Sequence, residues 1–398
     1  MSKFKKHLLG GGQAFKSSTW FDPDDIEEIR HTFFQEGSSL GGPWDRYREA
    51  HMRLPDWFQQ GLDPWSDEYA AQQHRLWSLI TGVERPYDPD NDEKESPWGD
   101  IDPVRYPGFY NWRGPQAMVT ASDHVLATGM ILKHCGLQAG DWAMEYGAGF
   151  GHTALTLSRL GVNVDTVDIS ATFCDFVRRQ AEHFQFPLQA FQGHFGVNPR
   201  PGQKYKLIWF YESFHHCLDF KRVVPLLEQH LEEGGRILMG GEPIEPKENV
   251  AVPYPWGVRL HSEVTAVMRQ THWFELGFSE PFLFELFGRS GFVGRRIDCE
   301  PSLFGRLHIF ERKADLKKAK PGSVFTVEEL LALDGEQFIN GAYLAALKRS
   351  PDEGGRKNYL AKLEGGATKA AILIDLAVSD EGRAAKSDFP GLRDLLRR

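Results

Sequence analysis

Trp142-Ala-Met-Glu-Tyr-Gly-Ala-Gly-Phe-Gly-His152 is the stretch that decides the fold. It opens with a short apolar run that ends in an acid, Glu145, and then places glycines at 147, 149 and 151 ahead of a helix-like segment, 153–160. A strand, a tight glycine turn and a helix make a ligand pocket in a doubly wound sheet, because backbone without side chains lets a ligand approach the first N–H groups of the helix. We therefore expect a loop that binds an anionic or nucleoside ligand.

Strand-like and helix-like segments alternate from residue 142 to residue 313, which is typical of a parallel sheet with helices on both faces. The apolar runs predict further strands at 162–168, 188–192, 207–211, 236–240, 293–297 and 306–311. Of these, 306–311 is the strand that can run antiparallel. Helical spacing predicts helices at 123–133, 173–184, 222–231 and 282–291. The fold class expected is thus α/β, with a doubly wound Rossmann-like sheet.

Residues 1–104 form an aromatic-rich region that we expect to be a helical layer, with a capped helix start at 22–29 and a helix at 70–80. Its acidic, proline-broken run at 87–97 predicts a loop or exposed linker. We expect its tryptophans to bury apolar area against the neighbouring domain, the alternative being stacking on a sugar or cofactor ring. These tryptophans are Trp20, Trp44, Trp57, Trp65, Trp77 and Trp98.

A basic, proline-ended connector at 314–323 separates the sheet domain, 105–313, from a C-terminal part at 324–398. This last part should be a small all-α domain. Thr326-Val-Glu-Glu329 has the form of a capping box, and apolar residues recur at helical spacing in 337–348 and 367–378.

The composition of the chain argues against several kinds of protein and of binding partner. The 398 residues carry a formal net charge of -9 and no basic tract, which argues against nucleic acid as a partner. The four cysteines form no CxxC pair, so neither a disulfide framework nor a structural zinc site is expected. No apolar run approaches the ~20 residues of a membrane span, and the N-terminus lacks the apolar run of a signal peptide. We therefore expect a cytoplasmic protein.

The glycine loop departs from the G-x-G-x-x-G fingerprint of nicotinamide and flavin proteins, because His152 occupies the place of the third glycine. With Asp168 at the end of the next strand, residues 105–313 resemble class I S-adenosylmethionine-dependent methyltransferases. The resemblance implies S-adenosylmethionine as the cofactor and S-adenosylhomocysteine as the product. The cofactor-binding residues that it implies are Glu145, Tyr146, Gly147, Ala148, Gly149, Gly151, Asp168, Ile169, Gly193, His194 and Tyr211. In most relatives an acid stands in the place of His194.

Candidate catalytic residues follow the strand at 207–211. Methyl transfer requires the protein to align the acceptor and remove its proton. His215 and His216 lie at the ligand edge of the sheet and titrate near working pH, so one of them is our candidate general base, with Glu212 orienting the substrate or the cofactor. Alternatively, one histidine caps a loop and the other packs. A metal on His215, His216 and Cys217 is disfavoured because adjacent side chains rarely converge on one ion, and no metal is expected.

The long span 241–261 follows the strand at 236–240, again on the ligand edge, and long loops within compact domains are usually functional. Its polar and aromatic side chains would suit a carbohydrate acceptor, and the alternative is a lid that excludes water. The candidate substrate-binding residues are Glu242, Tyr254, Trp256, Arg259 and His261.

Residues 324–388 resemble a helical domain of unknown function, related to phycobilisome-linker modules and often appended to bacterial enzymes of surface-polysaccharide synthesis. The motifs that carry the resemblance are Phe338-Ile-Asn-Gly-Ala-Tyr343, Arg349-Ser-Pro-Asp-Glu-Gly354 and Ser379-Asp-Glu-Gly382. The resemblance implies O-methylation of a sugar hydroxyl in a bacterial polysaccharide or glycolipid, with a protein partner or a homo-oligomer as further expectations. The alternatives are a small-molecule methyltransferase and a methyltransferase-fold binding module without turnover.

Overall fold

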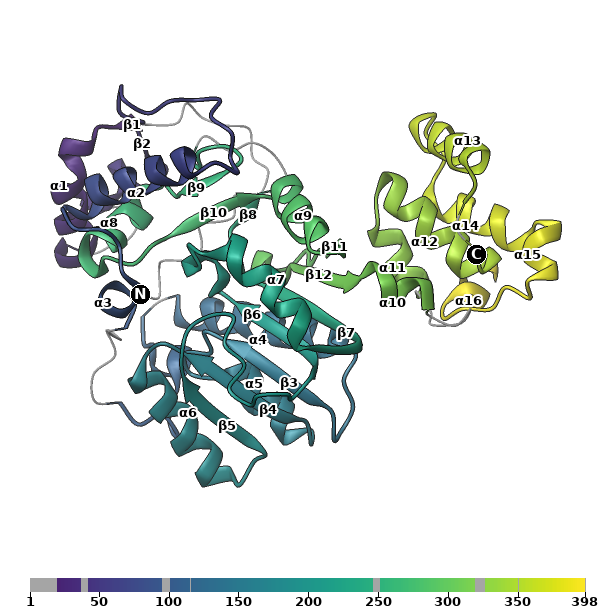
Figure 1. Ribbon diagram of the computed structural model, residues 1–398, viewed down its shortest axis with the longest axis horizontal. Helices are drawn as coiled ribbons and strands as arrows, with labels where there is room; N and C mark the ends of the chain where they lie inside the picture. Colours follow the sequence, from purple (N-terminus) through teal and green to yellow (C-terminus); the bar gives the residue numbers. More distant parts are fainter. Residues whose placement is uncertain are drawn as a thin grey trace.

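The computed structural model describes residues 20–36, 42–94, 101–114, 116–245, 251–318, 326–349 and 351–397. A large α/β part holds the central sheet, and a smaller helical part follows it at the C-terminal end (Figure 1). Of the sequence predictions, those for Trp98, for residues 1–19 and for 319–323 of the linker lie outside the described residues.

The central sheet has seven strands in the order β11-β12-β7-β6-β3-β4-β5. The strand β12 runs antiparallel to both of its neighbours, and the other strands run parallel to one another. The predicted doubly wound α/β sheet is confirmed, including the antiparallel direction of its last strand. The strands are β3 (Trp142–Tyr146), β4 (Asn163–Asp168), β5 (Leu188–Gln192), β6 (Tyr205–Tyr211), β7 (Leu231–Gly240), β11 (Phe292–Ile297) and β12 (Leu307–Arg312).

Both faces of this sheet are covered by helices. Along β6, Leu207 and Trp209 pack on one face with side chains of α4, α5 and α6, whereas Ile208 and Phe210 pack on the other with those of α7 and α9. This alternation follows from the two-residue period of a strand. The helices are α4 (Ala117–His134), α5 (His152–Arg159), α6 (Ala171–Phe184), α7 (Phe220–His230) and α9 (Glu280–Arg289).

A second layer joins the N-terminal region to the span after β7. The strands β8 (Ile244–Glu245), β10 (Leu276–Ser279) and β9 (Trp256–Val258) form a three-stranded sheet beside α8 (Ser262–Thr271). Two N-terminal helices, α1 (Ile26–His31) and α2 (Asp67–Thr81), pack against α8. The prediction of a long loop at 241–261 is therefore partly wrong, because β8 and β9 lie within it. Strands of two or three residues are too short to show an alternation of apolar and polar residues in the sequence.

Tryptophans bind this layer together as expected. Trp77 is fully buried, stacks on Phe274 with ring centroids 5.9 Å apart, and donates its indole N–H to the carbonyl of His272 at 3.0 Å. A two-stranded ribbon of β1 (Trp20–Phe21) and β2 (His51–Met52) adds to the N-terminal layer. Helices of 3₁₀ or π type occupy Pro23–Asp25, Thr32–Glu36, Pro43–Arg46, Gly108–Asn111, Phe214–His216 and Leu303–Gly305.

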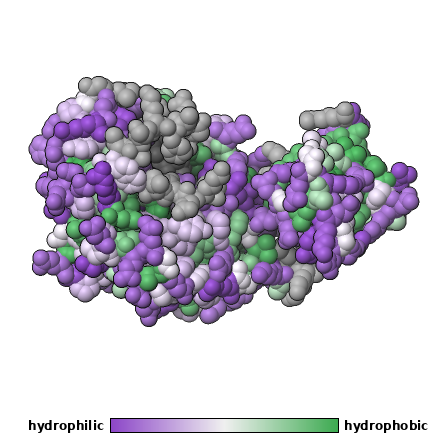
Figure 2. Space-filling model, turned by 90° about the horizontal axis from the view of Figure 1, so that it is seen from above, coloured by the Kyte–Doolittle hydropathy of each residue, from purple (hydrophilic) through white to green (hydrophobic). Residues whose placement is uncertain are grey.

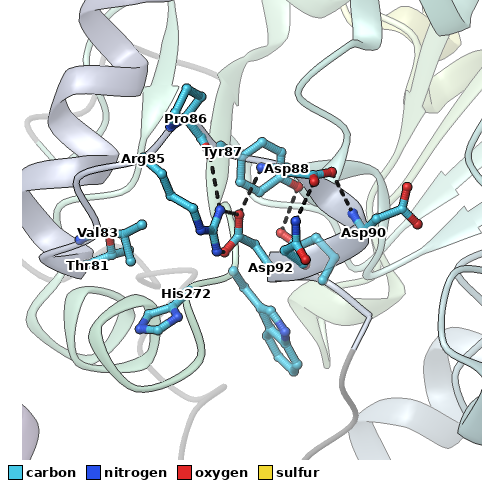
Figure 3. A network of polar contacts seen from close by, with 12 residues as sticks. Thr81, Val83, Arg85, Pro86, Tyr87, Asp88, Asp90, Asp92 and His272 are labelled. Carbon is cyan, nitrogen blue, oxygen red and sulfur yellow. Dashed lines mark hydrogen bonds and ion pairs between the residues drawn. The ribbon is translucent and has the colours of Figure 1, made fainter.

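The acidic run at 87–97 is ordered where the structure describes it, and it is not an exposed linker. Its helix α3 (Pro89–Asp92) ends on a carboxylate, Asp92, that is 3% exposed. The guanidinium of Arg85 donates to this carboxylate at 2.8 Å, and the backbone N–H of Asp88 donates to it at 2.9 Å (Figure 3). We call residues 83–94 the strap. The buried carboxylate of Asp92 is stabilised by donors within the strap itself, Arg85 and the backbone of Asp88, which the acidity of the run alone does not reveal.

The C-terminal part has its own apolar core, formed chiefly by α12 and α14. The helix α10 (Lys313–Lys318) leads towards it and occupies the first half of the predicted linker. The helices are α11 (Val327–Ala332), α12 (Gly335–Leu347), α13 (Glu353–Glu364), α14 (Lys369–Val378), α15 (Asp380–Ala384) and α16 (Leu392–Arg397).

Hydrophilic residues predominate on the face seen in Figure 2, with hydrophobic patches on both the α/β part and the C-terminal part. Among the helices that the structure describes, none has the length and apolar character needed to cross a bilayer.

Replacing Trp77 by Ala should lower the free energy of unfolding by about 3–5 kcal/mol, because a buried indole leaves a cavity. Leu79→Ala on the same helix is the matched control, since Leu79 is 38% exposed and should cost far less. Urea denaturation followed by circular dichroism measures both. Equal losses in the two variants would contradict the packing of α2 against the second sheet.

Candidate active site

The glycine loop lies between β3 and α5, at the carboxyl edge of the sheet. Gly147, Gly149 and Gly151 have φ values of 65°, 53° and 68°, a region that side chains other than glycine rarely adopt. A Cβ on Gly147 would lie 2.5 Å from the Cβ of Ser213, and one on Gly151 would lie 2.9 Å from a methyl of Val177. Glycine is therefore required both by backbone conformation and by close approach of neighbouring segments.

Asp168 ends β4 and fixes the glycine loop from the side. Its carboxylate accepts the backbone N–H of Gly149 at 3.0 Å and that of Ser170 at 2.9 Å. Burial raises the pKa of this carboxyl group, and the two backbone donors oppose the shift. Asp168 also lines the cavity, as do Ala148, Ile169, Gly193 and His194 among the predicted cofactor residues.

Three of the predicted cofactor residues do not line the cavity: Gly151, at the start of α5, and Glu145 and Tyr146, which lie behind the loop. Glu145 is 3% exposed and accepts the indole N–H of Trp209 at 2.7 Å. Burial, with the nearby charge of Asp168, raises the pKa of Glu145 to about 8. Tyr146 is fully buried and donates its hydroxyl to the carbonyl of Val197 at 2.8 Å. These side chains can support the loop but do not touch a ligand in the cavity.

Tyr211 and Glu212, at the end of β6, face the cavity from the other side. The Tyr211 hydroxyl lies 2.7 Å from Nδ1 of His124, which stacks on Phe109. Glu212 has a φ of 52°, and a Cβ on Gly241 would lie 2.6 Å from its Cγ. A non-glycine residue in the left-handed region costs free energy and is concentrated at functional sites.

One cavity of about 860 Å³ joins these elements, and this volume lies within the range of ligand pockets. The strap runs along it, because Tyr87, Pro89 and Glu93 are among its lining residues. At the end near Gly193, Asp90 of the strap approaches Nε2 of His194 to 3.5 Å.

Charged side chains from five segments meet at the cavity in a group that we call the His/Glu cluster. Its members are Glu93, His215, His216, Glu242, Arg259 and Glu275. All of them except Glu242 line the cavity directly.

Glu242 fixes the loop that carries the two histidines. Its Oε1 accepts the backbone N–H groups of Ser213 and Phe214, both at 2.9 Å, and its Oε2 lies 2.8 Å from Nδ1 of His215. If Nδ1 is the donor in this contact, the lone pair of His215 is on Nε2, the atom that lies 3.6 Å from Oε2 of Glu275.

Neighbouring charges raise the pKa of His216 and lower that of Glu275. Burial alone would lower the pKa of His216, but Glu93 and Glu275 outweigh it and raise this pKa to about 9. Glu93 lies 3.3 Å from Nδ1 of His216. Burial would raise the pKa of Glu275, yet Arg259 and the two histidines lower it to about 2. Glu275 forms an ion pair with Arg259.

Three of the predicted substrate residues lie away from this cavity. Trp256 is 1% exposed and packs between Tyr69 and Phe220, because β9 begins there and turns it towards the N-terminal layer. His261 packs against His51, and the exposed Tyr254 borders a separate small groove. The structure thus brings Glu242 and Arg259 to the predicted histidines but not the predicted aromatic platform.

Little in the sequence points to Glu93 and Glu275. Glu93 lies in a run whose acidity suggests a solvated segment. Glu275 offers one signal, since it is an acid within the apolar run Trp273-Phe-Glu-Leu-Gly-Phe278. Other lining residues missed from the sequence are His74, Tyr87, Phe109, His124, Phe195 and Trp273.

Two family models match parts of the chain. Residues 143–235 match the family model described as a methyltransferase domain, and residues 327–385 match a domain of unknown function, DUF4214. No curated protein sequence matches the chain.

Similar solved structures include the YcgJ protein of Bacillus subtilis, which is 19% identical with a TM-score of 0.35 over 44% of this chain and 71% of its own. An S-adenosylmethionine-dependent methyltransferase of Clostridium acetobutylicum is 13% identical, with a TM-score of 0.37 over 50% and 95%. Geranyl diphosphate C-methyltransferase of Streptomyces coelicolor is 15% identical, with a TM-score of 0.39 over 63% and 99%.

The strand order and the glycine loop agree with the expected class I architecture, and the family match identifies residues 143–235 as a methyltransferase domain. Its cofactor is S-adenosylmethionine. The roles of individual residues towards that cofactor stay predictions, which two experiments address.

Gly147→Ala should weaken the binding of S-adenosylhomocysteine by about tenfold or more, because the new Cβ must displace Ser213 or the loop. Gly140→Ala is the control, since Gly140 has a φ of 90° but no atom within 4 Å of the place that a Cβ would take. Both variants lose about 1 kcal/mol of stability to backbone strain. Calorimetric titration that gives both variants the same affinity would contradict the role of the loop.

Glu145→Gln tests the buried acid through its pH dependence. Because the folded pKa of about 8 lies above the ordinary 4.5, the stability linked to the protonated form is complete below pH 4.5 and is lost as the pH rises through 8. The wild type should therefore lose stability relative to the variant between these values. Urea midpoints at pH 5 and pH 9 measure the difference, and parallel curves would refute the shifted pKa.

Proposed function

We propose that this protein transfers the methyl group of S-adenosylmethionine to a sugar hydroxyl of a bacterial surface polysaccharide or glycolipid. The observation that carries the proposal is the continuous cavity that connects the glycine loop to the His/Glu cluster. One end has the backbone needed for the cofactor, and the other has polar groups that can bind and activate an acceptor.

At the cofactor end, Gly147 and Gly149 leave the backbone open, and Asp168, which lines the cavity, would accept the ribose hydroxyls. Ile169, Gly193 and His194 would border the adenine. Tyr211 and Glu212 would border the methionine part, on the side where the acceptor must approach.

At the acceptor end, His215 is the group on which activation depends most. The contact between its Nδ1 and Glu242 orients the ring, and with Nδ1 as the donor the lone pair is on Nε2. A hydroxyl acceptor must lose its proton as the carbon–oxygen bond forms, and a positioned imidazole can assist this loss. Glu242 acts through His215 and is a positioning residue.

The hydroxyl-rich nature of the acceptor is supported by the density of hydrogen-bonding groups at this end, with Tyr87 and Trp273 beside them as aromatic surfaces. The DUF4214 match supports a glycan context through the resemblance described above, and the helical domain would dock a partner. A small polar molecule is the second candidate, since the cavity of about 860 Å³ admits only the end of a long glycan together with the cofactor.

His215→Gln should lower kcat by about 10²–10⁴-fold while leaving the affinity for S-adenosylhomocysteine unchanged. The exposed His183 provides the control, and His183→Gln should behave as the wild type. Release of S-adenosylhomocysteine is measured with a panel of monosaccharides, nucleotide sugars, glycolipids and small phenols. Turnover of phenols but of no sugar would reject the sugar acceptor, and full activity of His215→Gln would reject the role of His215.

A further inference from the structure

The inner part of the His/Glu cluster has the geometry of a cation site. His215, His216 and Glu275 each offer a ligand atom, and these atoms all lie within 4.8 Å of one another. They come from two segments far apart in sequence, the 3₁₀ turn Phe214–His216 and the residue before β10. All three side chains line the cavity, so an ion held by them would face the acceptor.

The surroundings of these three residues resemble the outer shell of a metal site. A metal-bound histidine usually donates its other N–H to a carboxylate, which fixes the ring. Glu242 is so placed for His215, at 2.8 Å from Nδ1. The carboxylate of Glu93 lies 3.3 Å from Nδ1 of His216 as a charged neighbour, without forming a hydrogen bond to it. Arg259 holds the carboxylate of Glu275 in the same way that outer groups orient a ligating acid.

Charge balance supports a cation in this place. The cluster contains three carboxyl groups, of Glu93, Glu242 and Glu275, against one guanidinium, of Arg259. Buried carboxyl groups in excess over cationic side chains form a favourable environment for a bound cation.

We propose that His215, His216 and Glu275 bind a divalent transition-metal ion of the Zn²⁺ or Co²⁺ type. Two imidazoles and one carboxylate form the donor set of many zinc and iron sites, whereas Mg²⁺ and Ca²⁺ prefer oxygen ligands. Three protein ligands leave coordination positions open towards the cavity. This set differs from the His215, His216 and Cys217 combination, because Glu275 from another segment replaces the neighbouring thiol.

Such an ion would also take part in the methyl transfer proposed above, and this part of the inference rests on that proposed function. A hydroxyl bound to the ion loses its proton to water more readily, since the metal lowers its pKa. The acceptor oxygen then forms its bond to the methyl carbon as the sulfur–carbon bond breaks, which leaves S-adenosylhomocysteine. His215 would in this case act as a ligand, and its loss would still abolish turnover.

The test is titration of the untagged full chain, freed of metal by chelator, with Co²⁺. We expect about one Co²⁺ per chain, visible absorption bands of a four- or five-coordinate site, and displacement by Zn²⁺. His215→Gln, His216→Gln and Glu275→Gln should each lose these bands. His183→Gln and Glu285→Gln are matched controls on exposed residues and should keep them.

Glu242→Gln retains all three ligand side chains, so it tests the site even if the ligand variants fail to fold. It should weaken Co²⁺ binding by about 10–100-fold. Each variant is titrated with S-adenosylhomocysteine to show that the fold is intact. Wild-type protein that binds S-adenosylhomocysteine but no Co²⁺, or ligand variants that keep the absorption bands, would overturn the metal site alone. Failure to bind S-adenosylhomocysteine would instead overturn the proposed function.

Discussion

The parallel pairing of β3 with β6, with Glu145 opposite Trp209, is the constraint on which the site depends. Parallel neighbours end at the same edge of the sheet, so the loops that follow them leave side by side. Ser213 consequently approaches Gly147 so closely that no side chain fits, and its hydroxyl donates to the carbonyl of Tyr146 at 2.8 Å. The cofactor loop and the histidines are thus held in one rigid frame.

The opposite wall of the cavity is built by segments outside the central sheet. Glu275 precedes β10, and Glu93 ends the strap, yet the backbone N–H of Phe274 donates to Glu93 at 2.6 Å across 181 positions of sequence. The buried Asp92 and its partner Arg85 hold the strap in place, as Figure 3 shows. The N-terminal layer therefore does more than cover apolar surface, because it contributes Glu93 to the His/Glu cluster.

The sheet could be predicted from sequence because its signals are local. A glycine turn requires positive φ at particular positions, and the alternation of strand-like and helix-like segments is visible along the chain. The His/Glu cluster could not be predicted, because Glu93 and Glu275 meet His216 and His215 only through tertiary packing. The prediction for Trp256 was wrong for the same reason. The pairing of β9 with β10 decides whether this side chain lies in the cavity or in the core, and it places Trp256 in the core.

The His/Glu cluster is an unfavourable way to fill the interior of a protein. A buried set of ion pairs seldom stabilises a fold more than apolar side chains of the same volume would, since desolvation offsets the attraction between the charges. Here the cost is increased by the left-handed Glu212 beside it. The 3.6 Å between Nε2 of His215 and Oε2 of Glu275 is too long for a hydrogen bond, so the two groups face each other without closing the contact. The ion proposed above would bind both groups, and the cluster would then be explained by what it binds rather than by what it stabilises.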